Sequence, residues 1–101
     1  MPEFVRVAAV SEIPAGTIRE VDAGGHTIAL ANVDGEYFAL SNVCVHAGGP
    51  LGQGLLECST VECPWHGWQY DVKTGICGAN PRARIPTFPV KVEGGDVFVA
   101  L

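Results

Sequence analysis

The sequence lacks a long apolar run, a basic stripe and any stretch with sustained helical periodicity. Its apolar runs fall far short of the roughly 20 residues that span a bilayer, so we expect no membrane association. The formal net charge of −5 leaves no cationic surface to neutralise phosphates, which argues against nucleic acid as a partner. An acidic chain of this kind favours a partner with a basic surface.

The N-terminus also lacks the cationic start and apolar stretch of a signal peptide, so we expect a cytoplasmic protein. Disulfides are rare in that reducing compartment. The four cysteines of the chain are therefore expected to bind metal or to be reactive, rather than to form structural bridges.

The chain has 101 residues, of which 48% are hydrophobic and 17% charged, with 13 glycines and 7 prolines. This length suits one domain (1–101), and the composition is typical of a loop-rich β fold. Asp34-Gly35 and Gly94-Gly95 are hairpin turn signals between β-like runs. We predict an antiparallel β-sandwich or small barrel whose frame covers about 1–40 and 87–101. The predicted strands are 4–10, 17–21, 26–33, 36–40, 90–93 and 96–99.

The middle of the chain, about 41–86, holds all four cysteines, both tryptophans and two of the three histidines. We expect it to form loops on the frame and to carry the function. Two glycine-rich segments each contain one cysteine and one histidine: Cys44-x-His46 and, after sixteen residues, Cys63-x-x-His66.

Four interpretations of this pattern compete. Two buried cysteines and two ordinary loop histidines would have no function, but they would leave the matched pairs unexplained. A structural zinc site uses two cysteines and two histidines, although Cys-x-His is an awkward chelate for it. Nucleophilic Cys/His catalysis would leave one pair unused. A Rieske-type [2Fe–2S] centre uses all four residues, because two cysteines hold one iron and two histidines hold the other.

The segments CVHAGGPLG and CPWHGWQYD, with the Lys73-Thr74-Gly75 turn that follows, closely resemble the ligand loops of the Rieske iron–sulfur domain family. The resemblance covers nearly the whole chain. It implies an all-β, Rieske-type antiparallel sandwich with a two-loop cluster-binding subdomain and one [2Fe–2S] cluster. Cys44 and Cys63 match the family's ligands of the inner iron, and His46 and His66 match those of the outer iron. The resemblance implies no catalytic residues.

The resemblance also implies a monomeric one-electron carrier, a Rieske-type ferredoxin. It would take electrons from an NAD(P)H-dependent flavin reductase and pass them to a terminal aromatic-ring-hydroxylating oxygenase. The oxygenase subunits of this superfamily need two further histidines and a carboxylate, whereas here only His26 remains, which we expect on the surface. The alternative is the small Rieske-like subunit of an assimilatory nitrite reductase, whose members often lack the cluster ligands.

High-potential members of the family have two additional cysteines and a serine at the positions that here are Gly49, Trp65 and Trp68. Tyr70 matches a tyrosine that hydrogen-bonds a ligand sulfur in that group. We therefore predict a redox potential in the lower part of the Rieske range of about −150 to +300 mV.

Cys58 and Cys77 do not match the family's disulfide positions. We expect them to be free, partly buried thiols. A bond between them would require the fold to bring them together.

Overall fold

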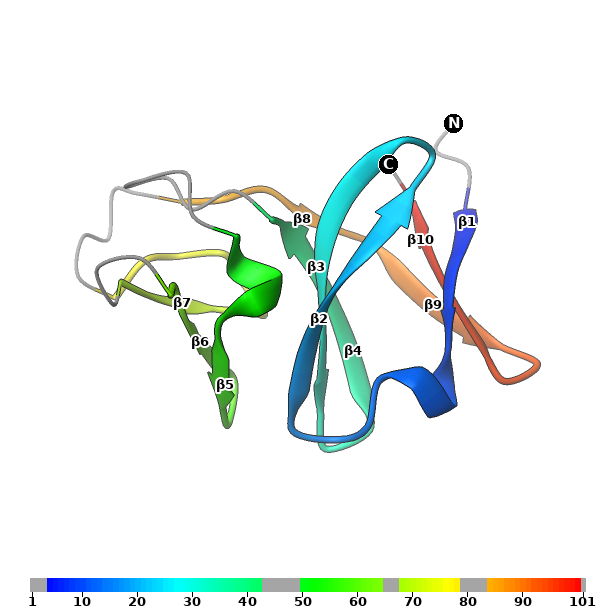
Figure 1. Cartoon of the computed structure of the whole chain (residues 1–101), viewed down its shortest axis with the longest axis horizontal. Helices are drawn as coiled ribbons and strands as arrows, with labels where there is room; N and C mark the ends of the chain where they lie inside the picture. The colour runs from blue at the N-terminus through cyan, green and yellow to red at the C-terminus, as the bar shows by residue number, and fades with distance from the viewer. Residues whose placement is uncertain (1–3, 43–49, 65–67, 79–83, 101) are drawn as a thin grey trace.

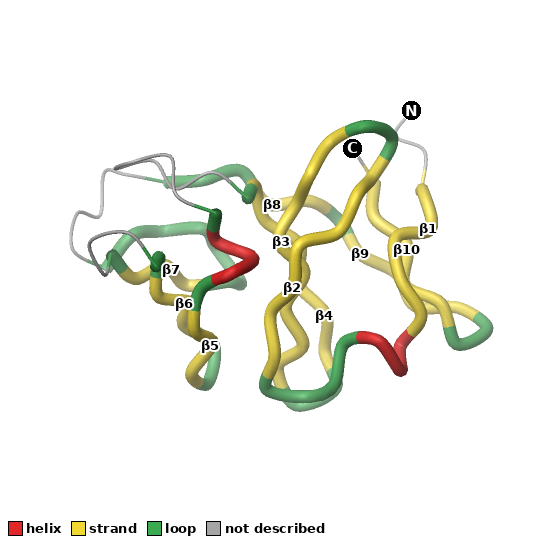
Figure 2. Tube along the Cα trace, in the orientation of Figure 1, coloured by secondary structure: helices red, strands yellow, loops and turns green. Residues whose placement is uncertain are grey.

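The computed structural model describes residues 4–42, 50–64, 68–78 and 84–100. These residues form three antiparallel sheets and two short 3₁₀ helices (Figures 1 and 2). The elements are β1 (Phe4–Ala9), η1 (Val10–Glu12), β2 (Thr17–Ala23), β3 (His26–Val33), β4 (Glu36–Ser41), η2 (Leu51–Gln53), β5 (Leu55–Glu57), β6 (Thr60–Glu62), β7 (Gln69–Asp71), β8 (Thr87–Phe88), β9 (Val90–Glu93) and β10 (Asp96–Ala100).

Two of the sheets form the frame, with strand orders β1-β10-β9 and β2-β3-β4-β8. The hairpin turns follow from the sequence. Asp34 and Gly35 have φ of 53° and 92°, the positive values that a two-residue turn between twisted strands requires. Gly94 and Gly95, with φ of 61° and 82°, do the same between β9 and β10. The antiparallel β fold expected from the sequence is confirmed, and all six predicted strands are present within two residues of their ends.

Strand β3 lies at the centre and is buried on both faces. Ile28 and Leu30 point into a core between the two frame sheets, which we call the frame core. Ala29 and Ala31 point the other way, into a second core, which we call the loop-side core. This alternation is the ordinary period of two of a strand, here with apolar residues on both sides. The molecule therefore has two cores that share one sheet.

The third sheet, β5-β6-β7, covers the loop-side core and lies to one side of the frame in Figure 1. Its inward-facing residues are Leu56, Val61 and Tyr70. The prediction that 41–86 consists of loops was therefore incomplete. Each of these strands has three residues and is bounded by a turn, so none is long enough to show a clear alternation in the sequence.

No helix in the described parts of the chain is long and apolar enough to cross a membrane. The only helices there are the two 3₁₀ turns, which agrees with the missing helical periodicity.

Candidate metal centre

Cys63 is the only one of the four predicted ligands that lies in a described segment. Cys44 and His46 belong to residues 43–49, and His66 belongs to residues 65–67; both segments lie outside the described residues. The structure therefore shows how these segments are held at their ends, and it shows the surroundings of one predicted ligand sulfur, that of Cys63.

Cys63 follows directly after β6 and continues its alternation. Thr60 and Glu62 face outward, whereas Val61 and Cys63 face the loop-side core, where Cys63 is 1% exposed. The backbone N–H of Cys63 donates to the carbonyl of Trp68 at 2.7 Å. This bond joins the two ends of the segment that contains His66. The strand thus directs the cysteine inward, and the backbone bond sets where the second motif starts and ends.

The first motif is joined at its ends in the same way. The N–H of Leu51 donates to the carbonyl of Asn42 at 2.8 Å, so the residues on either side of 43–50 are in direct contact. Asn42 follows β4, and the N–H of Ser41 donates to Pro86 at 2.9 Å, which ties this end to the chain just before β8. Both predicted ligand segments therefore start and end at a backbone hydrogen bond.

One apolar core brings the flanks of these segments together. Leu51, Cys63, Cys77 and Ile85 are all buried within the loop-side core and are at most 1% exposed. They flank the segments 43–49, 65–67 and 79–83. Burial of these four residues in one cluster brings the described flanks of the two predicted ligand segments into one core.

Tyr70, on β7, is fully buried in the same core as Cys63. It lies opposite Val61 in the β6–β7 pairing. A buried tyrosine hydroxyl needs a hydrogen-bond partner. This location is compatible with the predicted bond from Tyr70 to a ligand sulfur, which remains a prediction.

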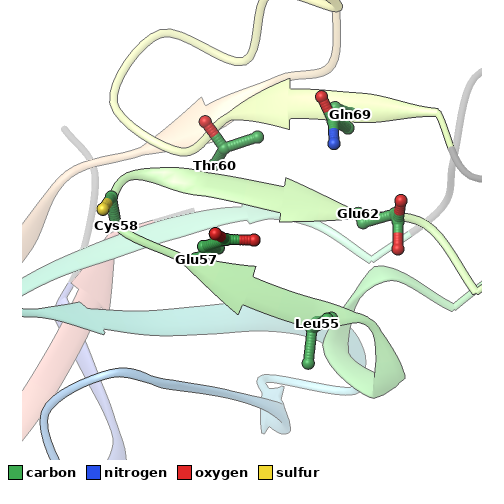
Figure 3. Close-up of a pocket in the computed structure, with 6 residues that line it drawn as sticks. All are labelled: Leu55, Glu57, Cys58, Thr60, Glu62 and Gln69. Atoms are coloured by element: carbon green, nitrogen blue, oxygen red, sulfur yellow. The ribbon is translucent and has the colours of Figure 1, made fainter.

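One pocket opens on the outward face of sheet β5-β6-β7. It has a volume of about 340 Å³ and is lined by Leu55, Glu57, Cys58, Thr60, Glu62 and Gln69 (Figure 3). These residues lie on the face opposite to Val61 and Cys63, and none of them is a predicted ligand.

The remaining cysteines and the third histidine have different environments. Cys58 and Cys77 are both free, as predicted, but only Cys77 is buried. The expectation of partial burial is wrong for Cys58, which is exposed at the β5–β6 turn because that turn projects into solvent. His26 is exposed at the start of β3, as expected. It lies on the frame and faces solvent.

The donor set fits a Rieske centre. Two thiolates and two imidazoles, split between two segments of the chain, match the ligand requirement of this cluster type. The one predicted ligand sulfur that the structure describes, that of Cys63, is buried in an apolar core, which would shield a bound cluster from water. The described residues alone contain no group of three metal-binding side chains, since three of the four predicted ligands lie outside them.

Comparisons with known proteins find the same family that the two motifs resemble. Residues 3–89 match the family described as "Rieske [2Fe-2S] domain". The ferredoxin component of the naphthalene 1,2-dioxygenase system of Pseudomonas aeruginosa is 37% identical over 100 residues, which cover 98% of this chain and 96% of that protein.

Two solved structures are similar over almost the whole chain. The ferredoxin of Sphingomonas yanoikuyae B1 has a TM-score of 0.88 and 33% identity, covering 98% of this chain and 99% of that one. A chain in the complex of reduced oxygenase and oxidized ferredoxin in carbazole 1,9a-dioxygenase has a TM-score of 0.87 and 33% identity, covering 96% and 92%.

Proposed function

This chain belongs to the Rieske [2Fe–2S] domain family, and we propose that Cys44, His46, Cys63 and His66 are the four ligands of its cluster. The protein carries one Rieske-type [2Fe–2S] cluster and is an electron carrier of the kind used by aromatic-ring dioxygenase systems. The observation that carries the ligand proposal is the pairing of two Cys/His motifs. The ends of both motifs meet at one buried core that contains Cys63.

The roles of the four side chains follow from their chemistry. The thiolates of Cys44 and Cys63 hold one iron, and the neutral imidazoles of His46 and His66 hold the other. When bound, the cluster supplies a one-electron redox couple. Imidazoles in place of two thiolates remove negative charge and raise the potential above that of an all-cysteine cluster. Because Cys63 is buried, its thiolate would hold iron out of contact with water.

We propose a terminal aromatic-ring-hydroxylating oxygenase as the electron acceptor. Support comes from the related ferredoxin, which is in a complex with the oxygenase of carbazole 1,9a-dioxygenase. We further propose an NAD(P)H-dependent flavin reductase as the electron donor, because a carrier that transforms no substrate needs a separate source of electrons. The ferredoxin relatives favour this carrier role over the nitrite reductase subunit.

We also propose that residues 1–101 form a single Rieske domain that works as a monomer in the cytoplasm. The match to relatives along almost their full length supports one domain. The free thiols of Cys58 and Cys77 are compatible with a reducing compartment.

The test of the ligand proposal is the spectrum and iron content of the purified protein and of Cys44→Ser, His46→Ala and His66→Ala. The wild-type protein should be red-brown and, after dithionite, give an EPR signal with a low average g value. Each variant should lose both signals. Full iron content and an unchanged spectrum in any variant would remove that residue from the ligand set.

Two further measurements test the carrier role. A redox titration should give a midpoint in the lower part of the family range of about −150 to +300 mV. A clearly positive midpoint would overturn that placement. Reduction by a flavin reductase, followed by oxidation by a ring-hydroxylating oxygenase, should be observed with the purified protein. An oxygenase that turns over equally fast without the protein would argue against the role.

A further inference from the structure

A polar network connects strand β2 of the frame to both ends of the first ligand segment. One carboxylate oxygen of Glu20 accepts from the side-chain amide of Asn42 at 2.6 Å, and the other accepts from that of Gln53 at 2.8 Å. The side-chain oxygen of Asn42 accepts from the backbone N–H of Gly52 at 2.6 Å. Asn42 precedes the undescribed segment, whereas Gly52 and Gln53 follow it in η2.

The network crosses the central sheet. Glu20 and Asn42 belong to chain segments that flank β3, which lies between β2 and β4. Strands on either side of a third strand are about 9.5 Å apart, so a direct side-chain bond needs a clear path over the middle strand. Ala29 of β3 pairs with Glu20 in the register, so the bond from Asn42 to Glu20 reaches over β3.

Gly52 packs directly against Glu20. A Cβ atom at Gly52 would lie 2.3 Å from Cγ of Glu20 and 2.7 Å from its backbone nitrogen, too close for any side chain. The 3₁₀ turn η2 thus sits on β2 with no space between them. Leu51, the first residue of η2, is fully buried in the loop-side core beside Cys63.

Both carboxylate oxygens of Glu20 and both polar atoms of the Asn42 side chain form hydrogen bonds within this network. Asn42 is 8% exposed, and both its amide and its oxygen are bonded. The hydrogen bonds from Gln53 and Asn42 lower the pKa of the Glu20 carboxyl below its ordinary value of 4.5, so Glu20 is ionised at neutral pH. Hydrogen bonds to an ionised carboxylate are stronger than those between neutral groups.

We propose that Glu20 is a positioning residue for the metal centre: with Asn42 and Gln53 it fixes the segment that carries Cys44 and His46 to the frame. Loss of the Glu20 side chain would leave the amides of Asn42 and Gln53 without their common acceptor. The ends of the segment would then move more freely relative to Cys63. This inference rests on the proposed ligand set, since it concerns how tightly that set is held.

The test compares holoprotein variants. Glu20→Ala removes both bonds, and Glu20→Gln keeps an acceptor for Asn42 while removing the charge. Asp22→Ala is the control, because Asp22 is an exposed carboxylate on the same strand. It accepts its described hydrogen bond from the hydroxyl of Thr27, within the β2–β3 hairpin. The measurements are the rate of iron release to excess chelator, the EPR g values after dithionite and the midpoint potential.

Glu20 is exposed, so water partly replaces its hydrogen bonds. Glu20→Ala should still release iron up to about tenfold faster than wild type, because two hydrogen bonds to a charged group are lost. Its EPR signal should broaden or shift. Glu20→Gln should restore much of the wild-type behaviour, and Asp22→Ala should stay within about twofold of wild type. A purely structural role would lower the thermal stability of the apoprotein and leave the EPR signal of the folded holoprotein unchanged.

Wild-type release rates and g values in Glu20→Ala would overturn the proposal. Cys44→Ser, prepared in parallel, separates this outcome from a wrong ligand assignment. If Cys44→Ser retains iron, the ligand set is wrong. If Cys44→Ser loses iron while Glu20→Ala behaves like Asp22→Ala, the ligand set stands and the positioning role of Glu20 is wrong.

Discussion

The frame core and the loop-side core lie on opposite faces of the same strand, but they are enclosed in different ways. The frame core is closed mainly by strands of four to eight residues, with the two-residue β8 at one edge, and by two-residue turns with the glycines that such turns favour. The loop-side core is covered by three-residue strands and by the flanks of the ligand segments. Short strands pair weakly by themselves, so we infer that the loop-side region depends on its cofactor, whereas the frame does not.

The largest effect should come from removing a proposed ligand. Cys63→Ala should abolish the visible absorption and the bound iron, and hydrogen exchange should become faster in residues 50–78, because the loop-side region loses its cofactor. Exchange in β2 and β3 should stay slow. Cys77→Ala, which removes an equally buried thiol from the same core, should keep the cluster. Uniform loss of protection across both regions would contradict the comparison.

Two leucines that are equally buried test the two cores separately. Leu30 lies in the frame core and Leu51 in the loop-side core, and both are 0% exposed. Each change to alanine should lower the free energy of unfolding by about 2–5 kcal/mol. Only Leu51→Ala should also speed iron release from the folded protein, measured by the decay of visible absorption with chelator. Equal release rates in the two variants would show that the cores are not distinct in this respect.

Two glycines with positive φ offer a smaller, matched comparison. Gly35 has φ of 92° and open space at its Cβ position, so Gly35→Ala should cost about 1–2 kcal/mol from backbone strain alone. Gly75 has φ of 78°, and a Cβ there would lie 2.2 Å from the carbonyl oxygen of Ile85. Gly75→Ala should therefore be the more destabilising of the two. Chemical denaturation of both variants measures this, and the reverse order would be inconsistent with the structure.

The smallest effect is a gain in stability. Cys58 has φ of 54° at the β5–β6 turn, a value that costs a non-glycine residue about 1–2 kcal/mol. Cys58→Gly removes that strain but gives the unfolded chain more freedom, which offsets about 0.4–1 kcal/mol of it. We expect a net stabilisation of about 0.5 kcal/mol by thermal unfolding. Cys58→Ala keeps the strain, so its stability should be close to that of the wild type. A gain in stability in Cys58→Ala would show that the effect comes from loss of the thiol and not from relief of strain.

Much of the frame was predictable because its signals are local. The hairpin between β3 and β4 has Asp34-Gly35 at its turn, and β3 was predicted with its true ends, 26–33. The strands β5 to β7 were missed because three residues do not establish a period. The exposure of Cys58 was also missed, since it depends on where the short hairpin projects.

The sequence by itself determined the family, because the two Cys/His motifs and their surroundings resemble its ligand loops and residues 3–89 match it. The proposed ligand set also comes from the sequence. Only the tertiary structure decided how those motifs are held. Glu20 lies 22 residues from Asn42 and 33 residues from Gln53 in the sequence. Contacts at such separations leave no periodic pattern in a sequence. They depend on the order of strands in the sheet, which places β3 between β2 and β4.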